Sequence, residues 1–183
     1  MNNELIEIDI NKKPYLKKIT EDKIINLTGE SGSGKSYYSL KYKKNGNYII
    51  IDTDEIFARY ETSTGINKDL GTYFRNKYSI LPSLFDDFDL IYNEILNYLN
   101  QSQKTIIIDS AQFRNMKNLN NLKGTVIVIR TCIKTCYERC INRFNQKNPT
   151  ATLTEKEIYA IKKKNIFVWY KSLNKFIEKV DNL

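Results

Sequence analysis

Eight consecutive residues of the chain have the types and spacing needed to hold phosphate groups. They read Gly29-Glu30-Ser31-Gly32-Ser33-Gly34-Lys35-Ser36 and are followed by Tyr37. The glycines and small serines allow the backbone to wrap around phosphate oxygens, to which its N–H groups then donate. In such a loop Lys35 bridges the β- and γ-phosphates and the Ser36 hydroxyl binds Mg²⁺. The spacing therefore predicts nucleotide binding by all nine residues, with ATP and Mg²⁺ as ligands.

Three aspartates follow apolar runs at the positions where parallel strands would end. Asp52 and Asp54 come after the run that begins at residue 48, and Asp109 ends the run that begins at residue 105. Ligands of open parallel sheets bind at that edge. We expect Asp54 to be catalytic, accepting a hydrogen bond from an acceptor hydroxyl, and Asp52 or Asp109 to assist Mg²⁺. Alternatively, these residues only cap local structure, including a helix predicted over residues 55–60.

Arginine is scarce in this lysine-rich chain, with six arginines among 29 basic residues. Arg139 and Arg143 lie four residues apart on one face of a predicted helix, where they could clamp a transferring phosphoryl group. We expect Arg139 to be catalytic and Arg143 to bind substrate, the alternative being a solvated basic face. Arg75 and Arg114 are candidates for binding an anionic acceptor.

The elements that must position these residues follow from the apolar patterns. Continuous apolar, largely β-branched runs over residues 24–27, 48–52, 105–109 and 125–129 are typical of parallel strands covered on both faces. Helices are predicted over residues 34–44, 84–99 and 134–144 and after a capping box that begins at Thr154. This alternation predicts an α/β fold, a three-layer sandwich with a mainly parallel sheet. We expect a single domain over residues 1–183, a short edge strand over residues 5–10 and a mobile lid around residues 143–153.

Composition limits the class of protein and its partners. The chain has 183 residues, a formal net charge of +8 and no apolar run long enough to cross a membrane. We therefore expect a cytoplasmic protein without a membrane partner. The positive charge suits a phosphate-rich partner, and nucleic acid is retained behind a small-molecule acceptor. Cys132, Cys136 and Cys140 recur every four residues, which predicts core packing on one helix face.

Taken together, these motifs resemble the small P-loop kinases of the P-loop NTPase superfamily: the nucleoside monophosphate, shikimate, gluconate and adenylylsulfate kinases. Two segments, Asp52-Thr53-Asp54 and Gly71-Thr72-Tyr73-Phe74-Arg75, look like those that follow the second strand of shikimate kinase. The resemblance implies that Asp54 and Arg75 contact the acceptor's hydroxyl and carboxylate, and that Asp52 assists Mg²⁺. The Gly-rich acceptor loop of shikimate kinase is replaced here by residues 109–114, so the resemblance concerns architecture and roles rather than shikimate itself.

The sequence thus predicts an ATP-dependent kinase that moves the γ-phosphoryl group of ATP to a hydroxyl or phosphate of a small metabolite or nucleotide. Two alternatives stay open. One is a polynucleotide-end kinase, and the other is a nucleotide-binding regulatory module with little phosphotransfer. The identity of the acceptor and the oligomeric state are not defined by the sequence.

Overall fold

A computed structural model describes residues 13–150 and 154–183, except for the side chains of residue 159 and residues 161–167. The strand predicted over residues 5–10 and the last part of the predicted lid lie outside these ranges. The strands and α-helices are β1 (Tyr15–Lys18), β2 (Ile24–Gly29), α2 (Lys35–Lys43), β3 (Tyr48–Asp52), α3 (Thr53–Ile56), α4 (Gly65–Lys77), α5 (Phe88–Tyr98), β4 (Thr105–Asp109), β5 (Thr125–Ile129), α6 (Ile133–Lys147) and α7 (Glu155–Asp181). Short 3₁₀ turns η1 (Tyr60–Thr62), η2 (Ala111–Asn115) and η3 (Leu119–Asn121) connect some of them.

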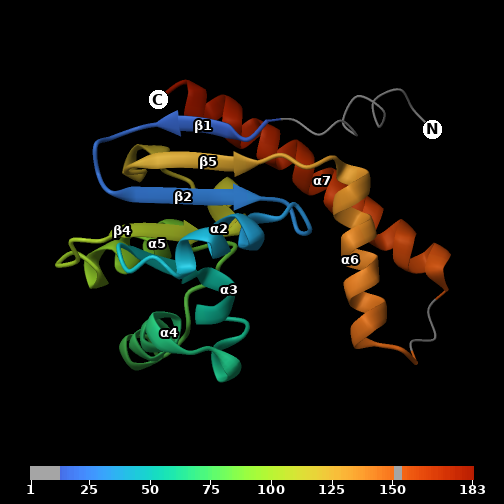
Figure 1. Ribbon diagram of the computed structural model, residues 1–183, viewed down its shortest axis with the longest axis horizontal. Coiled ribbons are helices and arrows are strands. Elements are labelled where there is room, and N and C mark those ends of the chain that lie inside the picture. Colours follow the sequence, from blue (N-terminus) through green and yellow to red (C-terminus); the bar gives the residue numbers. More distant parts are fainter. Residues whose placement is uncertain (1–12, 151–153) are drawn as a thin grey trace.

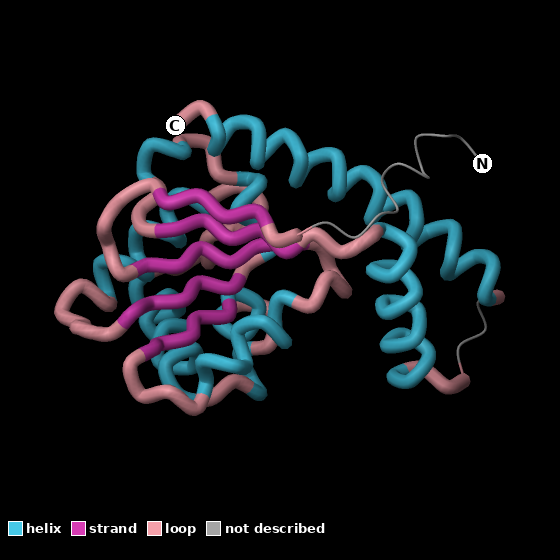
Figure 2. Tube along the Cα trace, turned by 45° about the horizontal axis from the view of Figure 1, so that its top comes forward, coloured by secondary structure: helices cyan, strands magenta, loops and turns pink. Residues whose placement is uncertain are grey.

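The five strands form one mainly parallel sheet in the order β1-β5-β2-β4-β3 (Figure 2). Strand β2 pairs in parallel with β4 and β5, and β3 pairs in parallel with β4. Among the described strands, the edge strand β1 alone is antiparallel, paired with β5. The four predicted apolar runs are therefore confirmed as parallel strands. Their carboxyl ends share one edge of the sheet, so the glycine loop (residues 29–36) meets there Asp52 and Asp109, which end β3 and β4, and Asp54, which follows β3.

Alternating side chains of the strands supply two apolar faces. On one face Ile51, Ile108 and Val126 belong to the main core with side chains of α4, α5 and α7. On the other face Leu27 and its neighbours pack against tyrosines of α2. Helices thus cover both faces of the sheet, which confirms the expected α/β class with its three layers (Figure 1).

Helices α6 and α7 pack against each other next to the carboxyl edge of the sheet (Figure 1). Cys136, Tyr137 and Cys140 of α6 and Tyr170 of α7 are buried between them. The predicted core packing is therefore confirmed for Cys136 and Cys140, whereas Cys132 is only partly buried as the N-cap of α6; the three cysteines form no disulfide. Helix α6 continues to Lys147, so the first residues of the predicted lid are helical. The capping box of Thr154 and Glu157 is confirmed at the start of α7.

Two local predictions differ from the structure. The helix predicted over residues 55–60 is wrong, because Asp52 caps α3 so that it starts at Thr53 and ends after one turn. Phe57 then leaves the helix and its ring packs 5.1 Å from that of Phe74 in α4. The helix predicted from residue 84 begins only at Phe88, since residues 83–87 form a turn in which the Ser83 backbone donates to Asp87. No helix within the described residues is long and apolar enough to cross a membrane.

We predict that Phe74 stabilises the part of the core that supports α3. Its side chain is fully buried, whereas Phe85 is 68% exposed and serves as a matched control. Phe74→Ala should lower the free energy of unfolding by about 3–5 kcal/mol because it leaves a cavity. Phe85→Ala should change it by less than about 0.5 kcal/mol. Urea denaturation of both variants measures the difference, and equal losses would contradict this assignment of the core.

Candidate functional site

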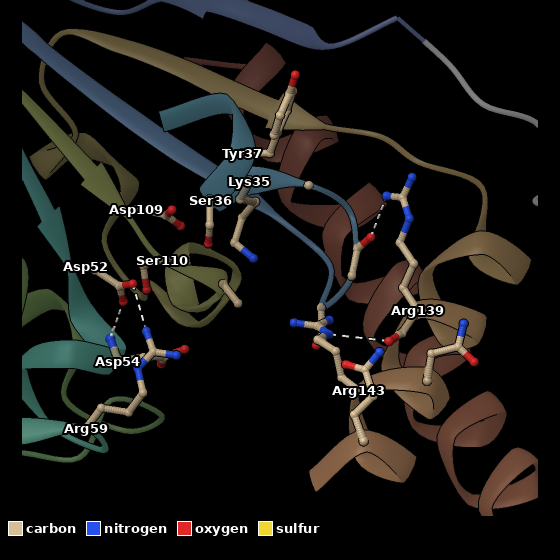
Figure 3. A pocket seen from close by; sticks show the side chains of 16 residues that line it. Lys35, Ser36, Tyr37, Asp52, Asp54, Arg59, Asp109, Ser110, Arg139 and Arg143 are labelled. Carbon is tan, nitrogen blue, oxygen red and sulfur yellow. Dashed lines mark hydrogen bonds and ion pairs between the residues drawn. The ribbon is translucent and has the colours of Figure 1, made fainter. Parts of the chain in front are cut away.

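A cavity of about 440 Å³ opens at the carboxyl edge of the sheet, between the glycine loop, α3, the end of β4 and one face of α6 (Figure 3). It brings together most of the side chains selected from the sequence. The predicted residues that line it are Ser31, Gly32, Gly34, Lys35, Ser36, Tyr37, Asp52, Asp54, Asp109, Arg139 and Arg143. Segments far apart in the chain, from the glycine loop to α6, therefore line one open cavity.

The glycine loop has a backbone shape that only glycine adopts readily. Gly32 and Gly34 have φ angles of 81° and 98°, in the left-handed region. A Cβ atom at Gly32 would lie 2.4 Å from the carbonyl oxygen of Cys136, so the loop rests directly on the backbone of α6. Gly34 is the N-cap of α2 and supplies no side-chain cap. The first N–H groups of α2 are thus available to an anion at the edge of the cavity.

Three side-chain contacts hold the glycine loop from behind. The Thr131 hydroxyl, just after β5, donates to the Ser33 carbonyl at 2.7 Å. Ser31 Oγ lies 3.3 Å from Cys140 Sγ of α6. The Arg114 guanidinium forms an ion pair with Glu30 at 3.0 Å. The loop is therefore fixed by three elements that follow it in the chain.

The Glu30–Arg114 pair is almost completely removed from water, with side-chain exposures of 2% and 6%. Burial raises the pKa of Glu30, and the charge of Arg114 and its hydrogen bond oppose this rise. Glu30 Oε2 is buried and has no hydrogen-bond partner among the described residues. Neither residue lines the cavity. Arg114, expected to be an acceptor contact, thus lies behind the loop with Glu30, and neither side chain faces the cavity.

Arg75 is also placed away from the cavity. Its guanidinium donates to the carbonyl oxygens of Ile56 and Gly71 at 3.0 Å and to that of Phe57 at 3.3 Å. It also stacks 3.6 Å from the centre of the Tyr60 ring. These contacts join α4 to the end of α3. The segment that looked like part of an acceptor site is therefore used for packing, and Arg75 is a link between elements.

Arg59 takes a place in the cavity that the sequence did not indicate. It forms an ion pair with Asp52 at 2.9 Å. The other carboxylate oxygen of Asp52 accepts hydrogen bonds from the backbone N–H groups of Asp54 and Glu55. Asp52 thus caps a helix, which is the alternative role considered for it from the sequence, and it also lines the cavity. Asp52 and Arg59 are seven residues apart in the sequence, and this spacing matches no sequence motif that would predict the ion pair.

Asp54 and Asp109 carry the less compensated negative charges of the cavity. The Asp54 carboxylate has no hydrogen-bond partner among the described residues, and loss of hydration together with the Asp52 charge raises its pKa. Burial raises the pKa of Asp109 to about 6, with further upward contributions from Asp52 and Asp54 and a lowering by Lys35. The described residues contain no group of three or more carboxylate or thiol side chains arranged to hold a metal ion.

The Lys35 amine points into the space between these carboxylates and α6 (Figure 3). It lies 3.5 Å from the carbonyl oxygen of Glu30, at the limit of a hydrogen bond. Ser36 lies beside it on the side of Asp109, and Tyr37 points away and is 84% exposed. The lysine is thus the central cation of the cavity.

One face of α6 forms the opposite wall. Arg139, Asn142, Arg143 and Gln146 line the cavity at the spacing of consecutive helical turns. Arg139 donates to the Gly32 carbonyl at 2.9 Å, and Arg143 donates to the Arg139 carbonyl at 3.4 Å. The two amides were not selected from the sequence, although their spacing from the arginines would have placed them on the same face.

Comparison of the chain with models of protein families gave no match, and comparison with curated proteins gave none either. The site is therefore interpreted from its own geometry.

We predict that Arg114 is needed mainly to compensate the buried charge of Glu30. Arg114→Ala should lower the free energy of unfolding by about 3–5 kcal/mol, because it leaves a carboxylate buried without a partner. Arg59→Ala, at a pair whose arginine is 55% exposed, should cost less than about 1 kcal/mol. The double variant Arg114→Met with Glu30→Gln should recover much of the loss. Equal effects of the two single alanine variants in urea denaturation would contradict the prediction.

We further predict a specific pH dependence from Asp109. Its pKa rises from 3.8 to about 6 on folding, so the folded state binds this proton more tightly than the unfolded chain. The resulting stabilisation is full below the unfolded value and is lost as the pH rises through the folded value. Without ligands, Asp109→Asn should therefore stabilise the protein by about 3 kcal/mol at pH 7 and flatten the pH dependence of stability between about pH 4 and 6. Asp69→Asn, at an exposed site, is the control, and a loss of stability in Asp109→Asn at pH 7 would contradict the prediction.

Proposed function

We propose that this protein is an ATP-dependent phosphotransferase of the small P-loop kinase type. The observation that carries the proposal is the single cavity in which the glycine loop and Lys35 lie opposite Asp54. The loop offers backbone donors and a lysine to a polyphosphate, while the aspartate offers a hydrogen-bond acceptor to the group that would receive phosphate. A site that only bound nucleotide would not need the second feature.

A second cavity supports a nucleotide as the phosphate donor. It has a volume of about 1050 Å³ and shares Gly34, Tyr37 and Arg139 with the first cavity. Its lining includes Tyr38 and Ile129. Aromatic and aliphatic surface next to a phosphate site suits a base and ribose. In this proposal the nucleoside occupies the second cavity and the triphosphate extends along the glycine loop into the first.

The reaction uses the residues around the first cavity in distinct roles. Asp54 accepts a hydrogen bond from the acceptor hydroxyl and orients it for in-line attack on the γ-phosphorus. A bond forms between that oxygen and the γ-phosphorus as the bond to the β–γ bridging oxygen breaks, and ADP leaves with the electron pair. The hydroxyl proton passes to Asp54. Lys35 and Arg139 stabilise the charge on the transferred group once Arg139 exchanges the Gly32 carbonyl for a phosphate oxygen.

The oxygen groups beside Lys35 fit a magnesium ion, which prefers hard oxygen ligands. Ser36 and Asp109 would hold it together with phosphate oxygens, and the ion would neutralise charge on the β- and γ-phosphates. Asp109 suits this role better than Asp52, because both oxygens of Asp52 already serve Arg59 and the start of α3. A nearby cation would also favour the ionised form of Asp109. We place the activity in the cytoplasm, where ATP is abundant and thiols stay reduced.

The test is ATP consumption with Mg²⁺ against nucleosides, nucleotides, sugar acids, shikimate and hydroxyl-ended oligonucleotides. At least one class should raise turnover well above the rate without acceptor, and Lys35→Ala should abolish the increase. Asp54→Ala should reduce phosphotransfer by at least about 100-fold while ATP affinity stays nearly unchanged, because it removes only the acceptor contact.

ATP binding by fluorescence titration provides the control for each variant. If ATP binds and no acceptor accelerates its loss, the proposed transferase is contradicted and the regulatory module becomes the better interpretation. A full rate in Asp54→Ala would instead show that another group orients the acceptor.

A further inference from the structure

The arginines that could recognise a charged acceptor are already occupied in this structure. Arg75 donates to three backbone carbonyls, and Arg114 is buried against Glu30. Neither lines the cavity. A carboxylate or phosphate on the acceptor would therefore not meet the two arginines that the sequence suggested for it.

Arg59 is the cation on the acidic side of the cavity, and Asp52 holds it. Asp52 is itself fixed, since its backbone N–H donates to Asn67 at 3.0 Å and its Oδ1 accepts from Asp54 and Glu55. An anion that took Arg59 would leave the Asp52 charge uncompensated next to Asp54. The Arg59–Asp52 pair thus adds no net positive charge to this side of the cavity.

The remaining cations face the other way. Lys35 belongs to the glycine loop, and Arg139 and Arg143 lie on the α6 wall (Figure 3). In the proposed function Lys35 and Arg139 serve the polyanionic triphosphate, and Arg143 lies one helical turn beyond Arg139 on the same wall. Asp54 is left on the acceptor side, where its carboxylate lines the cavity without a hydrogen-bond partner among the described residues, beside the Asp52–Arg59 pair.

We infer that the acceptor is an uncharged hydroxyl compound, such as a nucleoside or a polyol, and that acceptors with a carboxylate or phosphate close to the reacting hydroxyl are rejected. This inference rests on the proposed function and defines the substrate class of the same site. Its physical basis is repulsion between the Asp54 carboxylate and a like charge held close to it in the cavity.

The experiment compares matched acceptors that share the reacting hydroxyl and differ in one anionic group. Suitable pairs are a nucleoside and its 3′-monophosphate, glycerol and glycerate, and the methyl ester of shikimate and shikimate. Within each pair that reacts, kcat/KM should be at least about tenfold higher for the uncharged member. The ratio should shrink as salt is raised, because screening weakens repulsion between accessible charges.

A gain-of-charge variant tests the same point from the protein side. Ala111 lines the cavity just beyond Ser110. Ala111→Lys should narrow the ratio between uncharged and anionic acceptors by about tenfold, whereas Ala111→Met, of similar size and without charge, should leave it unchanged. An equal effect of both variants would show that space and not charge selects the acceptor, and would overturn the inference.

The outcomes separate this inference from the function on which it rests. Lys35-dependent turnover that prefers the anionic members, or is highest with hydroxyl-ended oligonucleotides, would overturn the inference and leave the transferase standing. ATP binding without acceptor-dependent turnover in any pair would overturn both. Preference for the uncharged members with the expected salt dependence would support both.

Discussion

The balance of charge in one recess is the constraint on which the other features of the site depend. One lysine, three arginines and three aspartates line the same cavity, and the Arg59 guanidinium forms an ion pair with Asp52. Burial raises the pKa of both Asp54 and Asp109, and the charge of Asp52 raises the two values further, while Lys35 lowers both. Such an arrangement disfavours a further anion beside the aspartates and favours a cation. A polyanion along the loop side, accompanied by a divalent ion, satisfies both requirements, as the proposed function uses them.

This balance of charge in the cavity requires that the glycine loop keep a fixed position at the carboxyl edge of the sheet. The loop follows the central strand β2, and its donors face the cavity only while its back is held. Gly32 lies against the α6 backbone, Thr131 bonds the Ser33 carbonyl, and Glu30 is tied to Arg114. The ion pair is the costliest of these supports, since two charges are removed from water to make it. The ion pair serves to fix positions, because it joins η2, which begins two residues after Asp109, to the loop that carries Lys35.

Short sequence patterns were sufficient to predict those elements whose structure depends mainly on neighbouring residues. The parallel strands follow from their apolar runs, and the start of α7 follows from the cap formed by Thr154. The glycine loop was recognisable because its backbone shape demands particular residues.

The positions of the arginines, in contrast, could not be predicted from short sequence patterns. Arg59 and Arg75 both follow β3 in the sequence, but only Arg59 lines the cavity. Which of the two reaches it depends on where α3 ends, at Ile56. That end depends on Phe57 packing against α4, a contact no short window contains. The antiparallel strand β1 was missed for a related reason, since only its pairing with β5 distinguishes it from a loop.

The α6 wall indicates how a ligand could be received without a large movement of the fold. Arg139 and Arg143 donate to backbone carbonyls, which are neutral acceptors. Phosphate oxygens form charge-assisted hydrogen bonds that are stronger, so a bound triphosphate would draw both guanidinium groups into the cavity by side-chain rotation. The helix itself is anchored where Cys136 meets Gly32 and where its buried face meets α7. A helix held at that point can move only by pivoting about it. In the proposed reaction, water is therefore excluded by arginine side chains that close over the phosphates.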